Sequence, residues 1–175
     1  MSKPKRQKYP DTSAIRKLPA LASQAIPERW EDQNGHINVG YYMSLYNDSG
    51  WPMLGLIGVD EEYFSKRKMG LVDLDNHIRY LRELHVGDRV TAYGRFFGQD
   101  EKRMHGMVFI VNDDTSTLAA TIEFLSISMD LRKRRPAAIP DDVAARLREV
   151  INAHQELGWT VPNCMSIPTC PDSSG

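Results

Sequence analysis

The sequence predicts one α+β domain, in which a curved antiparallel β-sheet wraps around a central helix and a second helix follows. Three observations carry this expectation. Residues 38–49 show helical periodicity, residues 70–129 contain four long segments of strand character, and residues 140–158 form an amphipathic helical pattern. One long helix beside a run of antiparallel strands is stable when the sheet closes around that helix and buries both apolar faces.

The domain is expected to span residues 22–158. Residues 1–21 carry six Lys or Arg residues against the single acid Asp11, which predicts a mobile or loosely docked basic arm. Residues 22–31 are a candidate first strand, and Pro27 confines it to an edge or a strand end. Residues 159–175 are expected to form a tail.

The central helix is expected to follow the first strand directly. Asn38 is a suitable N-cap, and an apolar face recurs at helical spacing through Ile37, Tyr41, Leu45 and Tyr46. Gly50 and Pro52 interrupt the pattern, so the helix should end or kink near Ser49, and residues 53–57 could add a further turn. Residues 61–68 suggest a short helix or turn.

Four strands follow. In the first, charged or polar residues alternate with the apolar Val72, Leu74, Ile78 and Tyr80, which is typical of a half-buried strand. The others are expected at residues 89–98, 103–111 and 117–129, and the last has so few charges that it should lie centrally. Short connections predict that consecutive strands are antiparallel neighbours.

The final helix, residues 140–158, has Asp141 and Asp142 at its start and Gly158 at its end. Its apolar face comprises Val143, Leu147, Val150, Ile151, His154 and Leu157. The exposed edges of the predicted sheet favour pairing with a second copy, so we expect a homodimer or homotetramer.

Composition excludes several classes of function. The chain of 175 residues is 41% hydrophobic and carries 22 basic and 23 acidic residues, for a net charge of -1. This balance argues against nucleic acid or an anionic membrane as partner. The amino terminus lacks the apolar segment of a secretory signal. Only Cys164 and Cys170 are present, in the expected tail. A reduced cytoplasmic protein is therefore expected.

The chemically richest segment is Asp32-Gln33-Asn34-Gly35-His36-Ile37-Asn38, directly before the central helix. Asp32 is a candidate general base or nucleophile that faces a carbonyl group. The first backbone N–H groups of the helix, around Val39 and Gly40, are candidate donors to an oxyanion. Asn34 and His36 are candidates to orient water or the acyl group. The alternative is that these side chains merely cap a turn and a helix.

Two further groups of residues could bind substrate. Arg132, Lys133, Arg134 and Arg135 follow the last strand, and such a run suits phosphate groups, although a solvated basic turn explains it equally. Tyr41 and Tyr42 could line an acyl pocket or simply belong to the core. No metal site is expected, because His77, His85, His105 and His154 form no second cluster at ligand spacing.

These residues resemble the hotdog-fold acyl-CoA thioesterases of the 4-hydroxybenzoyl-CoA thioesterase type. The family motif, approximately Asp-x-x-Gly-His-x-Asn-x-x-x-Tyr, is met by Asp32, Gly35, His36, Asn38 and Tyr42. The segment HIRYLRELHVGDRV, with its Gly87-Asp88 turn, adds support, and the resemblance covers about residues 22–131. The sequence departs from the family where a second Asn is common and Val39 stands here.

The resemblance implies a hotdog fold and hydrolysis of an acyl-CoA, with no cofactor beyond the coenzyme A of the substrate. It assigns Asp32 as general base or nucleophile and the Val39 N–H as the donor to the thioester carbonyl. Asn34 and His36 stand where acyl-carrier-protein thioesterases carry an Asn and a His. It also implies an active site at a dimer interface. The sequence is compatible with the betainyl-CoA thioesterases of carnitine breakdown, but nothing in it selects a quaternary ammonium group.

Two rival functions share this fold. A hotdog enoyl-CoA hydratase also uses an Asp and a His, but at a longer spacing than the four positions from Asp32 to His36. A non-catalytic acyl-CoA sensor would need a DNA-binding module, and residues 1–21 are too few and too polar to form one.

Overall fold

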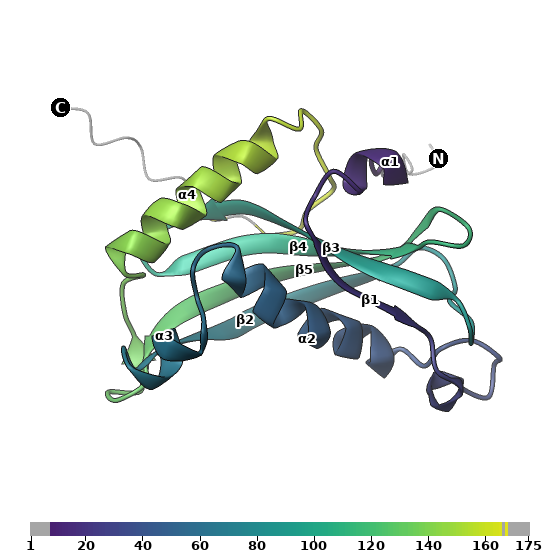
Figure 1. Ribbon diagram of the computed structural model, residues 1–175, viewed down its shortest axis with the longest axis horizontal. Coiled ribbons are helices and arrows are strands. Elements are labelled where there is room, and N and C mark those ends of the chain that lie inside the picture. Colours follow the sequence, from purple (N-terminus) through teal and green to yellow (C-terminus); the bar gives the residue numbers. More distant parts are fainter. Residues whose placement is uncertain (1–7, 166, 168–175) are drawn as a thin grey trace, which may run out of the picture.

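The computed structural model describes residues 8–165 and residue 167. It confirms the α+β architecture: a curved antiparallel sheet packs around the long helix α2 (Figure 1). The strands are β1 (Ala20–Ala25), β2 (Met69–Tyr80), β3 (Arg89–Gln99), β4 (Arg103–Asn112), β5 (Thr117–Asp130) and β6 (Arg135–Pro136). The helices are α1 (Thr12–Ile15), a 3-10 turn (Glu28–Trp30), α2 (Gly40–Gly55), α3 (Glu61–Ser65) and α4 (Asp141–Gln155).

The strand order is β1-β3-β4-β5-β2, with β6 beside β5. The central placement of the strand at residues 117–129 is confirmed, because β5 lies between β4 and β2. The expected pairing of β2 with its successor β3 is wrong. β2 instead pairs along its whole length with β5. Residues 81–88, which connect β2 to β3, cross the end of the sheet with Leu84 fully buried, and the Leu84 carbonyl accepts from the Ile37 N–H at 2.9 Å.

The first strand is displaced from the predicted residues 22–31. β1 begins at Ala20 and ends at Ala25, since Pro27 has no N–H for a ladder and instead precedes the 3-10 turn that buries Trp30. The long helix does not end near Ser49. It continues through Pro52 to Gly55, and the buried Met53 keeps this last part packed on the sheet.

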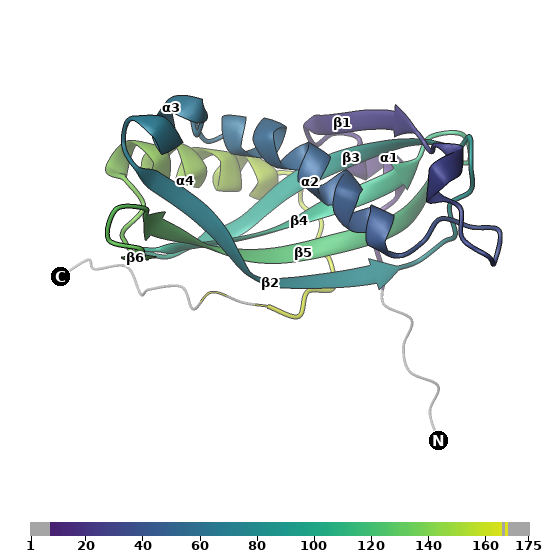
Figure 2. The same ribbon diagram turned by 90° about the horizontal axis from the view of Figure 1, so that it is seen from below.

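Both faces of the sheet are covered. α2 and α4 lie on one side, and the segment after α4 crosses the other (Figure 2). On that second side the buried Ile15 and Leu18 pack with Trp159 and Val161 in one cluster, and the Arg95 guanidinium lies 4.1 Å from the Trp159 ring centroid. A loosely docked arm is therefore wrong for residues 12–21, and residues 159–161 are packed rather than a free tail. No helix in the described part of the chain is long and apolar enough to cross a membrane.

α4 confirms the predicted closing helix and presents Val143, Leu147, Ile151 and His154 to the interior. The His154 Nδ1 accepts the Phe96 N–H at 3.1 Å, which requires a neutral imidazole. Burial, and secondarily the Arg95 charge, lowers the pKa of His154 to about 4. The imidazole thus binds a proton more readily in the unfolded chain than in the folded one.

Acid should therefore destabilise the fold through His154. The unfolded chain takes up a proton near pH 6.5 and the folded one only near pH 4, so His154 stabilises fully above pH 6.5 and loses its contribution as the pH falls toward 4. We expect the free energy of unfolding in urea to fall by about 2 kcal/mol more between pH 7 and 5 in the wild type than in His154→Gln. Equal losses in both proteins would contradict this role.

Candidate active site

The loop before α2 folds as a tight turn that fixes the Asp32 backbone. The Asp32 N–H donates to the His36 carbonyl at 2.9 Å, and the Gly35 N–H donates to the Asp32 carbonyl at 3.1 Å. Gly35 has φ +77°, a left-handed conformation that glycine adopts without steric cost. Glu31 and Ile37 pair as an isolated bridge across the base of this turn. The motif glycine is therefore required by the backbone geometry.

The Asp32 carboxylate is oriented by its neighbours and remains accessible. Oδ1 accepts the Asn34 N–H at 2.7 Å, and the Asn34 Nδ2 lies 3.4 Å from Oδ2. The His36 Nδ1 lies 3.7 Å from Oδ1, and the Asp32 side chain is 20% exposed. The structure thus brings Asp32, Asn34 and His36 together, with a carboxylate held in place but open to a reactant.

The start of α2 offers one open donor rather than two. The Asn38 Oδ1 accepts the Gly40 N–H at 3.0 Å, so Asn38 caps the helix as the sequence predicts. Gly40 is therefore unsuited as a second donor to an oxyanion, which corrects that expectation. The Val39 N–H has no hydrogen-bond acceptor among the described residues. Val39 as a residue is 57% exposed.

The two tyrosines that follow occupy different environments. Tyr41 stacks on Trp30 with ring centroids 4.8 Å apart and lines a hollow that also contains Asp32. Tyr42 is buried against Tyr80, and burial, followed by the Tyr80 and Glu83 charges, raises its pKa to about 12. Tyr41 thus borders the candidate site, whereas Tyr42 belongs chiefly to the core beneath it.

A pocket of about 300 Å³, which sequence reasoning missed, opens between α2 and the sheet. Its walls include the apolar Met53, Leu71 and Phe96, and its polar side contains Tyr46, Asn47, Asp73 and Ser126. Asp32 does not line it. Within one chain the pocket and the Asp32 carboxylate are therefore separate features.

A β-bulge explains why Asp73 faces this pocket. In the β2–β5 ladder Asp73 pairs with Ser126 and Asp75 with Leu125, so Leu74 is the extra residue. The bulge reverses the alternation of β2 from that point. Asp73 turns toward α2, while Val72 and Leu74 remain 47% and 54% exposed on the outermost strand. The expectation that Val72 and Leu74 lie on the buried face of this strand is therefore wrong. A period-two pattern assumes an unbroken strand, and the bulge breaks it.

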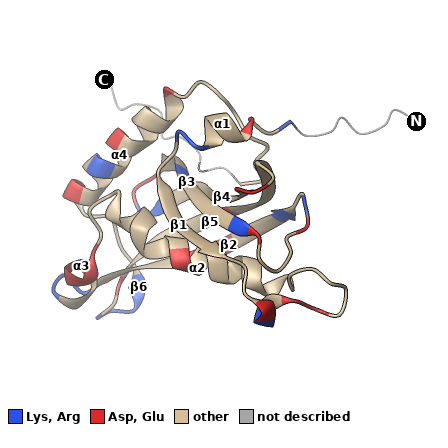
Figure 3. Cartoon of the chain, turned by 45° about the vertical axis from the view of Figure 1, so that its right-hand side comes forward, with Lys and Arg blue, Asp and Glu red and all other residues tan. Residues whose placement is uncertain are grey.

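The basic run forms an exposed turn between β5 and β6. The Asp130 carboxylate accepts the N–H groups of Arg132 and Lys133 at 2.9 Å each. Both hydrogen bonds lower the pKa of Asp130, and the bond from Lys133 has the larger effect. Figure 3 shows this blue turn near β6 and α3, away from the loop that precedes α2. Within one chain the basic turn, which follows Asp130 at the Met69 end of β2, and the loop that carries Asp32 are therefore separate.

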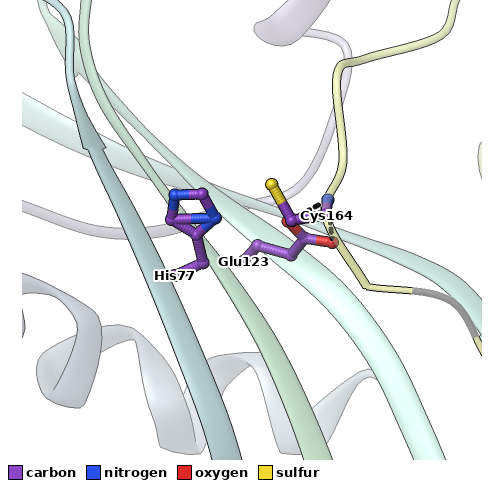
Figure 4. A group of neighbouring side chains, drawn as sticks. All are labelled: His77, Glu123 and Cys164. Carbon is purple, nitrogen blue, oxygen red and sulfur yellow. Dashed lines mark hydrogen bonds between the residues drawn. The ribbon is translucent and has the colours of Figure 1, made fainter.

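A second polar cluster lies on the opposite face of the sheet. The His77, Glu123 and Cys164 ligand-type atoms lie within 4.8 Å of one another (Figure 4). Glu123 is buried, pairs with the His105 Nε2 at 2.8 Å and accepts the Cys164 and Met165 N–H groups. The Arg79 Nη2 donates to the Cys164 Sγ at 2.9 Å, which puts a guanidinium where a metal ion would need negative ligands. The cluster instead anchors the segment after α4; Cys170 lies outside the described residues.

Comparison with known proteins identifies the family to which this chain is similar. Residues 26–147 match the model of the thioesterase-like superfamily. An L-carnitine dehydrogenase/betainyl-CoA thioesterase of a Rhizobium species is 30% identical over 147 residues, which cover 84% of this chain and 29% of that protein. The betainyl-CoA thioesterase of Pseudomonas aeruginosa is 26% identical over 140 residues, 80% of this chain and 87% of that protein. The chain thus spans less than a third of the length of the Rhizobium protein.

Solved structures share the fold. A Staphylococcus aureus protein in complex with CoA has a TM-score of 0.73 and 22% identity, over 86% of this chain and 97% of that chain. A 1,4-dihydroxy-2-naphthoyl-CoA thioesterase from Synechocystis has a TM-score of 0.64 and 13% identity, over 74% of this chain and 95% of that chain. At these identities the structures support the architecture alone.

Proposed function

The chain belongs to the thioesterase-like superfamily, and we propose that it hydrolyses the thioester bond of an acyl-CoA, releasing a carboxylic acid and free coenzyme A. The observation that carries this proposal is the accessible Asp32 carboxylate, fixed by Asn34 in the loop that leads to the open Val39 N–H. An oriented carboxylate and an unpaired amide are the two groups that attack on a thioester requires.

The reaction can proceed in either of two ways. As a general base, Asp32 removes a proton from water while the oxygen of that water attacks the thioester carbon, and the tetrahedral intermediate then expels the CoA thiolate and leaves the carboxylic acid. As a nucleophile, the carboxylate attacks directly, expels the CoA thiolate and forms an anhydride that water then hydrolyses. In both cases the Val39 N–H would stabilise the oxyanion, and the positive end of α2 would assist. Asn34 holds Asp32, and His36 stands beside it as a proton carrier.

A homodimer formed through β2 would complete the site. β2 lies at the edge of the sheet and exposes the apolar Val72 and Leu74, which favours pairing with a second β2. Two-fold antiparallel pairing about the middle of β2 puts the Met69 end of one strand beside the Tyr80 end of the other. Tyr80 packs on Tyr42 near the start of α2, with ring centroids 4.9 Å apart.

This pairing would bring the separate features together. The pocket of one subunit, near Leu71 and Asp73, would come beside the loop of the other subunit that carries Asp32. The basic turn lies beside the start of β2, where the Leu131 N–H donates to the Lys68 carbonyl at 2.8 Å. It would therefore also come near the Asp32 loop of the other subunit. We infer that the acyl group enters the pocket of one subunit while Asp32 of the other attacks the thioester.

Thiol release tests the proposed function. The purified protein is incubated with short, branched, aromatic and betainyl-CoA esters, and free thiol and carboxylic acid are measured together. The names of the relatives make betainyl-CoA the first ester to assay. We expect equimolar acid and thiol from at least one ester. Absence of thiol release from every ester would refute the proposal.

The basic turn should contribute to binding rather than to chemistry. Replacing Arg132, Arg134 and Arg135 with Ala should raise KM for the acyl-CoA roughly tenfold and leave kcat nearly unchanged, because contacts to the CoA phosphates persist from ground state to transition state. The matched substrate is the acyl-pantetheine, which lacks the nucleotide and its phosphates. If the wild type hydrolyses both substrates equally well, the turn does not bind the CoA phosphates.

A further inference from the structure

Every side-chain hydroxyl that lines the pocket between α2 and the sheet already donates its proton to another described group of the protein. The Ser126 hydroxyl donates to the Asp73 Oδ1 at 2.6 Å, and the Tyr46 hydroxyl donates to Oδ2 at 2.7 Å. The hydroxyl of the fully buried Ser49 donates to the Leu45 and Tyr46 carbonyls at 2.8 Å each. A hydroxyl has a single proton, so these three oxygens offer a ligand acceptors only.

Asp73 sets the direction of two of these hydrogen bonds. An ionised carboxylate has no proton to donate, so both hydroxyls must donate to it. Burial, followed by the charge of Asp73 and the hydrogen bond to it, raises the pKa of Tyr46, so the phenol keeps its proton and remains a donor. The Asn76 Nδ2 is a third donor to Oδ2, at 3.2 Å. Because the two carboxylate oxygens have about four lone-pair positions, Asp73 can still accept from a ligand.

The remaining side chains of the pocket add one donor. Asn47 lies on the exposed side, and its amide both donates and accepts, so it favours neither kind of ligand group. The other lining side chains are apolar, Met53, Phe96 and Phe124 among them. Asp73 lies on the exposed edge strand, where water screens its charge. The pocket should therefore discriminate by the direction of hydrogen bonds rather than by charge.

From this arrangement we propose that the pocket selects a short aliphatic acyl group that carries a hydroxyl, over the same carbon skeleton with an oxo group. A ligand hydroxyl can donate to Asp73 or Ser126, whereas a ketone oxygen would meet acceptors at both. Asp73 determines this specificity, because it fixes the protons of Tyr46 and Ser126. The volume of about 300 Å³ suits a short chain. The inference rests on the proposed thioesterase function and names the class of its acyl group.

Two esters with the same carbon skeleton test the direction of hydrogen bonding. 3-Hydroxybutanoyl-CoA carries a donor at the carbon where 3-oxobutanoyl-CoA carries only an acceptor. The kcat/KM of each ester is divided by its rate constant for hydrolysis by hydroxide, which removes the intrinsic difference in thioester reactivity. We expect the wild type to prefer the hydroxy ester by roughly tenfold in this corrected kcat/KM, the scale of one hydrogen bond to a charged group.

Asp73→Asn should reverse part of this preference. The amide keeps one acceptor oxygen, but its Nδ2 donates to one of the two hydroxyl oxygens, and the proton of that hydroxyl then turns toward the ligand. We expect the variant to hydrolyse the oxo ester roughly threefold faster than the wild type and the hydroxy ester roughly threefold slower. The matched control is Asp75→Asn, which removes an exposed carboxylate from the same strand and should leave both rates unchanged.

Equal corrected kcat/KM values for the two esters in the wild type would overturn the inference. So would an Asp73→Asn variant that slows both esters equally, because that result indicates a structural role. If neither ester but some other acyl-CoA is hydrolysed, the inference fails and the proposed function stands. If no acyl-CoA is hydrolysed, both fail.

Discussion

Asp32→Asn should reduce kcat for acyl-CoA hydrolysis by roughly a hundredfold or more. The amide can still accept the Asn34 N–H and occupies nearly the same volume, but it can neither remove a proton from water nor attack the thioester. Thiol release under saturating substrate measures kcat, and thermal unfolding tests whether the fold is intact.

The control for this variant is Asp48→Asn, which removes an exposed carboxylate from α2 and should leave kcat unchanged. Because Asp32 is partly exposed and paired with no Lys or Arg among the described residues, neither substitution should lower the melting temperature by more than a few degrees. An Asp32→Asn protein with kcat within a few-fold of the wild type would show that Asp32 is not the reactive group.

Val39→Pro should also reduce kcat strongly, by about a hundredfold, the usual cost of removing one donor from an oxyanion hole. Proline lacks the N–H group that we assign to the thioester oxygen. The φ angle of Val39 is −53°, within the range that a proline ring imposes, so the backbone can keep its path. The loss should appear in kcat and kcat/KM alike, since the donor acts in the transition state.

Val39→Ala is the matched control, because it shortens the side chain and keeps the amide. We expect near-normal kcat from it, with any change confined to KM. If Val39→Pro folds with a normal melting temperature and retains activity, the oxyanion is stabilised elsewhere. If Val39→Ala is as inactive as Val39→Pro, the side chain rather than the amide matters.

The periodic parts of the fold could be predicted from sequence. The helix after Asn38, the strands near residues 89, 103 and 117 and the helix after Pro140 all lie close to their expected positions. Their apolar residues recur over many positions, so the pattern survives local irregularities. The loop from Asp32 to Asn38 could also be predicted, because its Gly35 turn and its Asn38 cap are local features encoded by single residues.

The features that were missed depend on contacts distant in sequence or on single backbone irregularities. The period-two pattern of the sequence does not reveal the bulge at Leu74. Because of this bulge, Asp73 rather than Val72 faces α2. The pairing of β2 with β5 depends on where the segment around Leu84 packs. Ile15 and Trp159 lie outside any periodic segment, so their joint burial could not be recognised from either one alone.

The separation of the site within one chain has a different cause. A sequence describes one subunit, whereas Asp32 and the Asp73 pocket would meet only across a β2–β2 contact between two subunits. Asp32 and the basic turn could therefore be recognised from the residues only as separate features, and only the family resemblance implied a site shared between subunits. The exposed Leu74 at the sheet edge is the structural feature on which we base the proposed contact.

Mixed dimers test this shared site most directly. One subunit carries Asp32→Asn, and the other carries Gly50→Phe, which fills the pocket from a position where an added Cβ meets no atom within 4 Å. Different affinity tags on the two subunits allow the mixed dimer to be purified after coexpression. A dimer of wild type with Gly50→Phe serves as control and should keep about half the wild-type activity, since one of two sites remains intact.

We expect each variant alone to be inactive and the Asp32→Asn/Gly50→Phe dimer to recover about half the wild-type activity, because one of its two sites combines an intact Asp32 with an intact pocket. If each site were built within one subunit, both sites of that dimer would be defective. An inactive mixed dimer beside an active control dimer would therefore contradict the assembly of the active site across β2.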